Sequence, residues 1–89
     1  MEVKLEIPEY SKENGIRYNW TDGFTIEAKI LTDPKETYLY IKANKEGLIS
    51  LANHFMNLAQ DNIPSGYHMH FDTHADLEEG SCEVIIEKM

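Results

Sequence analysis

The spacing of hydrophobic residues changes along this chain, and that change limits the folds open to it. Before Ala43 the apolar residues mostly alternate with polar ones, which is the period-two pattern of β-strands. From Leu48 they recur every three or four positions, which is typical of one side of an α-helix. Alternation returns after Gly66. An order of strands, one helix and strands, without βαβ repetition, predicts an α+β domain.

Several segments before the helix are expected to form strands. Alternation over residues 2–7 predicts a first strand. Within residues 16–30, Asp22-Gly23 separates two alternating runs, and this dipeptide favours the type I′ turn of a β-hairpin. The segment TYLYIKA, 37–43, predicts another strand with both faces partly covered, and TDPKE before it predicts a turn.

The helical segment is predicted to be amphipathic and about four turns long. Its apolar side, expected to face the core, consists of Leu48, Leu51, Ala52, Phe55, Leu58 and Ala59. Ser50, Asn53 and Asn57 are expected on the solvent side, with His54 at the boundary. Asn44 is expected to be the N-cap, because its side chain can accept a hydrogen bond from the first turn.

Two strands, 67–72 and 82–88, are expected after the helix. Since 89 residues leave room for one core, residues 1–89 are predicted to form a single domain. Its expected architecture is a mainly antiparallel β-sheet of four to six strands with one amphipathic helix packed on one face. Cys82 alternates in phase with Val84 and Ile86, so its thiol is expected to face the core.

The charge is distributed unevenly along the chain. The net charge is −8, yet residues 46–89 contain eight acids and Lys88 as the only base. A surface of this sign repels nucleic acid and anionic lipid, and it attracts a basic partner; alternatively, the charge serves only solubility. No apolar run approaches the ~20 residues of a membrane span, and no signal peptide is visible, so a cytoplasmic location is expected.

The segment GYHMHFDTHADLEEGS, 66–81, contains the most distinctive side chains. In a strand, His68, His70 and Asp72 share one face, while Tyr67, Met69 and Phe71 share the other. Two histidines spaced this way can chelate zinc, but Asp72 would lie about 13 Å from His68, too far for the same ion. We therefore assign no metal site, and a metal- or small-ligand-binding domain using the His-x-His strand remains the alternative reading.

The sequence offers little support for an enzyme. It contains no glycine-rich phosphate loop, no HExxH and no G-x-S-x-G motif. Cys82 could be paired on paper with a histidine base, but an inward-facing thiol is inert. We expect no catalytic residue and no cofactor.

The second half of the chain resembles immunity protein family 32 of bacterial polymorphic toxin systems. The resemblance rests on NKEGLISLANHFMNLAQ, on the Gly-x-His-x-His-x-Asp strand at 66–72, and on LEEGS followed by an apolar final strand. It implies a small cytoplasmic protein that binds a partner toxin and blocks its active site or substrate channel.

Together, the resemblance and the charge suggest how such a partner would be bound. The toxin could be a basic nuclease-type domain, since its nucleic-acid groove would attract carboxylates. The partner-binding residues are then expected to be His68, His70, Asp72, Asp76, Glu78 and Glu79. A further reading is a module whose sheet edges pair with a second copy of itself to form a homodimer.

Overall fold

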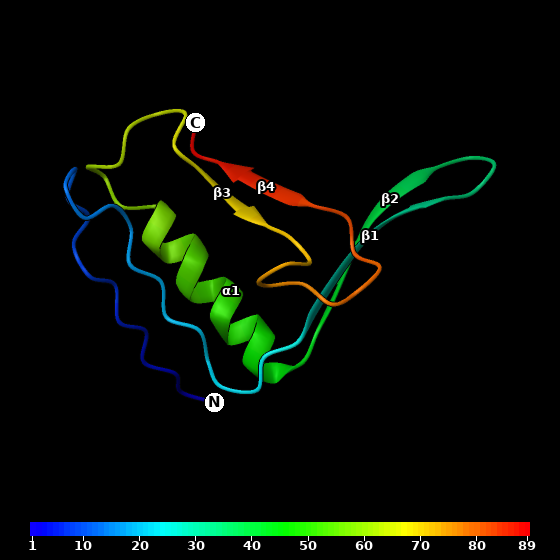
Figure 1. Ribbon diagram of the computed structural model, residues 1–89, viewed down its shortest axis with the longest axis horizontal. Coiled ribbons are helices and arrows are strands. Elements are labelled where there is room, and N and C mark those ends of the chain that lie inside the picture. The colour runs from blue at the N-terminus through cyan, green and yellow to red at the C-terminus, as the bar shows by residue number, and fades with distance from the viewer.

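The computed structural model describes all residues, 1–89, and has the predicted α+β composition. Its elements, in chain order (Figure 1), are β1 (Ile26–Thr32), β2 (Thr37–Ala43), α1 (Lys45–Leu58), β3 (His68–Phe71) and β4 (Val84–Glu87). β1 pairs with β2 and β3 with β4, both in antiparallel register. α1 is not long and apolar enough to cross a membrane.

The prediction of one sheet with four to six strands is wrong, because the four strands form two separate two-stranded sheets. The connection between β3 and β4 lies along the open edge of β1. The N–H of Glu78 donates to the carbonyl of Ile26, and the N–H of Cys82 donates to that of Ala28, both at 2.8 Å. This irregular segment occupies the edge of β1 that a further strand would need.

The strand predicted at 2–7 and the first arm of the hairpin predicted at 16–30 are also wrong. Neither segment forms regular strand pairing, although both run along α1 (Figure 1). A turn does form at Asp22-Gly23: the N–H of Phe24 donates to the Thr21 carbonyl at 3.2 Å, and Gly23 has a φ of 81°. It is not the predicted type I′ turn, because Asp22 lacks the positive φ that this type requires. Only the segment after this turn continues into a strand, β1.

The predicted start of the helix is confirmed. The Asn44 side-chain oxygen accepts the N–H of Gly47 at 2.8 Å, as an N-cap does. The same oxygen accepts the N–H of Thr25 at 2.9 Å, and the Asn44 amide donates to the Gly23 carbonyl at 2.8 Å. One side chain thus caps α1 and attaches the preceding turn to it.

The predicted orientation of the helix is wrong only in part. Leu58 is in the core and Leu51 packs against it, as expected, but the polar side is buried as well. The polar residues Ser50, Asn53 and Asn57 are 0–3% exposed, whereas Leu48 and Phe55 are 57% and 45% exposed. The reason lies in the two extended N-terminal segments, whose backbone groups have no neighbouring strand. The buried polar side of α1 provides the hydrogen bonds that a strand would otherwise supply.

These hydrogen bonds follow the helix from its first turn to just beyond its end. Ser50 Oγ accepts the N–H of Thr21 at 2.9 Å. Beyond the C-terminus of α1, Gln60 accepts the N–H of Tyr10 at 2.8 Å and donates to the carbonyl of Pro8 at 3.1 Å. The N-terminal segments are therefore held by side chains spaced along one side of the helix.

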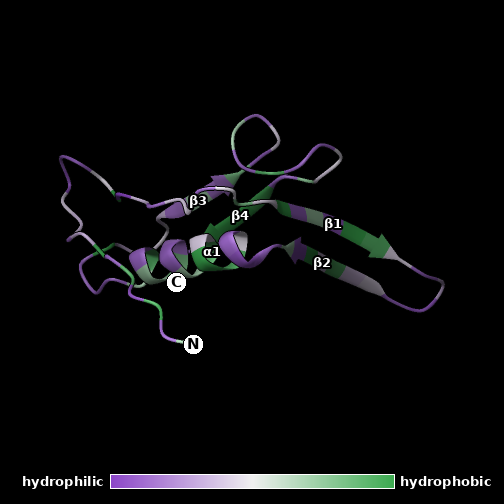
Figure 2. Ribbon diagram, turned by 90° about the horizontal axis from the view of Figure 1, so that it is seen from below, coloured by the Kyte–Doolittle hydropathy of each residue, from purple (hydrophilic) through white to green (hydrophobic).

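The buried apolar core lies where both sheets meet the helix and the 72–81 loop. It consists of Ile26, Ala28, Leu58, Ile63, Met69, Phe71 and Leu77. Beyond Ala28 the β1–β2 hairpin projects away from the rest of the molecule (Figure 2). Leu39 and Tyr40, which are neighbours on β2 and so point to opposite faces, are 64% and 42% exposed, so the expectation that both faces of 37–43 are partly covered is wrong.

Candidate functional site

The outer face of the β3–β4 sheet carries the histidines singled out in the sequence. The predicted alternation is confirmed, since His68 and His70 are exposed while Met69 and Phe71 are 4% and 3% exposed. His68 lies opposite Glu87 on β4, and His70 lies opposite Ile85. The histidines therefore face solvent beside an acidic residue of the neighbouring strand.

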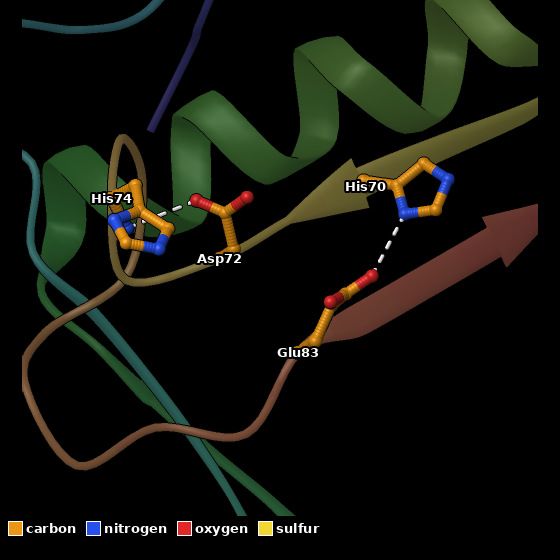
Figure 3. Close-up of polar contacts among 4 residues, drawn as sticks. All are labelled: His70, Asp72, His74 and Glu83. Carbon is orange, nitrogen blue, oxygen red and sulfur yellow. Dashed lines mark hydrogen bonds and ion pairs between the residues drawn. The ribbon is translucent and has the colours of Figure 1, made fainter.

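His70 also has a direct acidic partner. Its Nδ1 lies 2.9 Å from a carboxylate oxygen of Glu83, the residue just before β4 (Figure 3). The rings of His68 and His70 meet edge to face, with 4.9 Å between their centroids. Both side chains of the pair with Glu83 are about half exposed, so the contact contributes roughly 0–1 kcal/mol to stability.

Asp72 has a structural role in the loop that follows β3. One of its carboxylate oxygens accepts the N–H groups of His74 and Ala75 at 3.0 and 3.2 Å (Figure 3). Its backbone carbonyl accepts the N–H groups of Asp76 and Leu77. Asp72 therefore shapes the turn, and part of its hydrogen-bonding capacity is already used.

Glu78 and Glu79 are exposed residues in the second half of this loop. The loop is fixed beside them, because the buried Leu77 is part of the core and Ser81 Oγ accepts the N–H of Ala28 at 3.1 Å. Cys82 follows, and it packs against the core as the sequence predicts. Two carboxylates are thus held outward on a well-anchored loop.

The alternative metal-binding reading can be compared with the positions of the side chains. The structure contains no group of three or more His, Cys, Asp or Glu side chains placed to hold one metal ion. His68 and His70 are neighbours, but Glu83 contacts the Nδ1 of His70 directly. That nitrogen is therefore already engaged by a carboxylate.

A second part of the site was not predicted from the sequence. The N-terminal segment, α1, β3 and the 72–81 loop line a cavity of about 250 Å³ that is open to solvent on one side. It is lined by Tyr18, Trp20, His54, His68, His70 and Asp76, with two core residues of β3. His54 is 1% exposed, so its predicted boundary position is wrong. The sequence did contain a sign of this burial, because four polar residues recur at helical spacing on one side of the helix: Ser50, Asn53, His54 and Asn57.

The rings of this cavity form a packed aromatic group. Tyr18 stacks on His54 at 4.2 Å between ring centroids, and Trp20 contacts His54 at the same distance. Burial lowers the pKa of His54, although the Ser50 carbonyl and the charge of Asp76 oppose this shift. Burial also raises the pKa of the Asp76 carboxyl, and it raises that of Tyr18 to about 12.

Comparison with known families identifies the chain. A family model described as Immunity protein 32 matches residues 38–89, more than half of the sequence. The chain belongs to the Immunity protein 32 family. No curated protein and no solved structure matches it. The sequence-based assignment to this family is therefore confirmed.

The matched region contains most of β2, all of α1, β3 and β4, and the acidic loop between the last two strands. Every partner-binding residue expected from the sequence lies within it. Tyr18 and Trp20 lie outside it, although they complete the cavity around His54. The candidate site thus combines the family region with side chains from the N-terminal segment.

Proposed function

We propose that this immunity protein binds a cognate bacterial toxin in the cytoplasm and neutralises it by occupying a basic functional surface, without a catalytic step of its own. Family membership gives the general role. The proposed contact surface consists of His68, His70, Asp72, Asp76, Glu78 and Glu79, together with Glu83 and Glu87 beside them.

The observation that carries this proposal is the anchored acidic loop. Glu78 and Glu79 are exposed, while the hydrogen bonds to Ile26 and Ala28 fix the backbone beside them. A loop already held in one conformation loses less entropy on binding than a mobile one. The only base in the acidic half, Lys88, donates its Nζ to the Gln60 carbonyl. Lys42 of β2, however, lines a pocket together with Glu78 and offsets part of the negative field at that end of the surface.

Complementary charge chiefly affects association rate and selectivity. A nuclease-type toxin has a basic groove for its substrate, so it is the partner class that fits best. The same charge disfavours nucleic acid and anionic membranes as ligands of the immunity protein itself.

The test is a binding experiment with the product of the adjacent toxin gene. The double variant Glu78→Gln/Glu79→Gln should slow association about tenfold at low salt and reduce its salt dependence. Its unfolding free energy should change by less than about 0.5 kcal/mol, because both residues are exposed. Glu2→Gln/Glu36→Gln, the matched control, changes the charge equally at exposed positions elsewhere and should associate at the native rate.

Equal association rates for the two double variants would contradict the proposed surface. Failure of the native protein to bind or protect against the toxin would contradict the proposed function itself. Light scattering of the free protein and of the complex would give the stoichiometry, and a stable free dimer would support self-association.

A further inference from the structure

One residue that lines this cavity, His54, has a buried ring nitrogen without a hydrogen-bond partner. His54 Nδ1 lies 2.6 Å from the Ser50 carbonyl oxygen, which has no proton to give. Nδ1 must therefore carry the hydrogen, and in the neutral ring Nε2 is left as an acceptor. Nε2 is buried and has no hydrogen-bond partner. An unpaired buried acceptor costs about 1–3 kcal/mol, so a donor that reached Nε2 after a small movement of the surrounding rings would remove this cost.

The charge of the cavity indicates which kind of donor fits. Asp76 is its only side chain with a full charge at neutral pH, and no lysine or arginine lines it. Because burial keeps the imidazole of His54 neutral, His54 does not compensate this carboxylate. An anion would be repelled here, whereas a cation that carries N–H donors would satisfy both acceptors.

The walls and size of the cavity indicate which cationic group fits it best. Tyr18 and Trp20 supply aromatic surface, on which a guanidinium packs well because it is planar and weakly hydrated. A volume of about 250 Å³ is below the range of drug-sized ligand sites and suits one side chain. The exposed His68 and His70 border the cavity, so it adjoins the acidic surface described above.

We propose that this cavity is a receptor for an arginine side chain of the partner, with His54 Nε2 and the Asp76 carboxylate as its acceptors. Only the origin of the arginine rests on the proposed toxin-binding function; the site and its preference for a guanidinium are properties of this chain. The remaining surface contacts would then provide charge steering, while the cavity would supply a buried anchor of the kind that dominates interface energies.

The isolated protein allows a direct test, because Trp20 is the only tryptophan and lines the cavity. Its fluorescence would be followed while N-acetyl-arginine amide is added. A single side chain should bind with a dissociation constant on the order of millimolar. N-acetyl-citrulline amide has nearly the same shape without the charge and should bind at least about fivefold more weakly. N-acetyl-lysine amide distinguishes a guanidinium from a generic cation and should bind more weakly than the arginine probe.

Two matched variants locate the site. Asp76→Asn preserves the shape of the side chain and should weaken binding of the arginine probe about fivefold, whereas Asp61→Asn, the same change at an exposed position outside the cavity, should not. In the nitrogen NMR spectrum of the native protein, the His54 Nε2 signal should shift on addition of the arginine probe. This shift would report directly on hydrogen bonding to Nε2, the proposed acceptor atom.

The inference is overturned if the arginine probe gives no saturable response, if citrulline binds equally well, or if Asp61→Asn has the same effect as Asp76→Asn. Toxin capture that persists after any of these outcomes would leave the proposed function standing. Conversely, arginine binding without toxin capture would support the site while contradicting that function.

Discussion

The side-chain amide of Asn53 donates to the carbonyl oxygen of Glu6 at 2.9 Å, joining residues that are 47 positions apart. The Asn53 oxygen meanwhile accepts the N–H of Asn19 at 3.1 Å and an N–H of the Asn57 amide at 2.9 Å. One helical side chain thus connects both extended N-terminal segments. In this fold, the middle of α1 supports backbone that would normally be supported by a strand.

Asn53→Ala should therefore lower the unfolding free energy by about 2–4 kcal/mol, because it leaves buried polar groups without partners. Denaturant unfolding followed by circular dichroism would measure this loss. Met56→Ala is the matched control, since Met56 lies on the same helix and is 53% exposed. If both variants lose the same stability, the polar side of the helix does not hold the N-terminal segments.

Burial of the polar side of the helix also changes which of its apolar residues contribute most to stability. Leu58 is 5% exposed and belongs to the core, whereas Phe55 is 45% exposed. Leu58→Ala should cost about 2–5 kcal/mol of stability through cavity formation, and Phe55→Ala should cost less despite its larger side chain. Thermal unfolding of the two variants gives the comparison. A greater loss for Phe55→Ala would support the orientation that the apolar spacing predicts.

Local signals in the sequence predict much of this fold. Asn44 marks the start of α1, and alternation predicts β2, β3 and β4 close to their observed bounds. These features depend on helix capping and on the alternation of apolar and polar side chains, and both are determined by residues close together in the sequence. The His68 and His70 face and the inward Cys82 follow from the same local rule.

The errors concern partners that are distant in sequence. Residues 2–7 alternate as a strand does, but a strand also needs a neighbour, and these residues lie beside α1. The hydrophobic pattern of the helix places Leu51 and Leu58 correctly, but it gives no sign that the polar side is buried as well. The cavity is missed for the same reason, because Tyr18 and Trp20 reach His54 only after the N-terminal segment has packed on the helix.

Gly47 offers a separate test of the contact between α1 and the β1–β2 hairpin. A Cβ at this buried position would lie 2.5 Å from the Thr25 carbonyl oxygen and 3.0 Å from a side-chain carbon of Ile26. Replacing a helical glycine by alanine ordinarily stabilises by about 1 kcal/mol. Here Gly47→Ala should instead destabilise by about 1–3 kcal/mol, because backbone must move to admit the methyl group.

Denaturant unfolding of Gly47→Ala would decide the sign of this effect. If Gly47→Ala were stabilised, the first turn of α1 would not be packed closely against Thr25 and Ile26. Ala52→Gly, on the same helix but only half-buried, is the control for helix propensity and should lose about 1 kcal/mol.

The buried imidazole of His54 predicts how stability varies with pH. Burial lowers its folded-state pKa, so between that value and about 6.5 the unfolded chain binds the extra proton. The unfolding free energy should therefore fall as the pH drops below about 6.5. Tyr18, His68, His70 and Asp76 surround the ring. The raised pKa of Asp76 acts in the opposite sense, because its folded form binds a proton more readily as the pH falls.

His54→Phe isolates this contribution, because it keeps an aromatic ring between Tyr18 and Trp20 but cannot be protonated. Denaturant titrations of both proteins from pH 7.5 down to pH 5.5, limits of about one unit either side of the usual histidine pKa, would give the two slopes. The native protein should lose more stability over this interval, by up to about 1.4 kcal/mol for each pH unit. Parallel slopes would mean that the ring is not held neutral in the folded state, and Nε2 would then be unavailable as an acceptor for the proposed arginine.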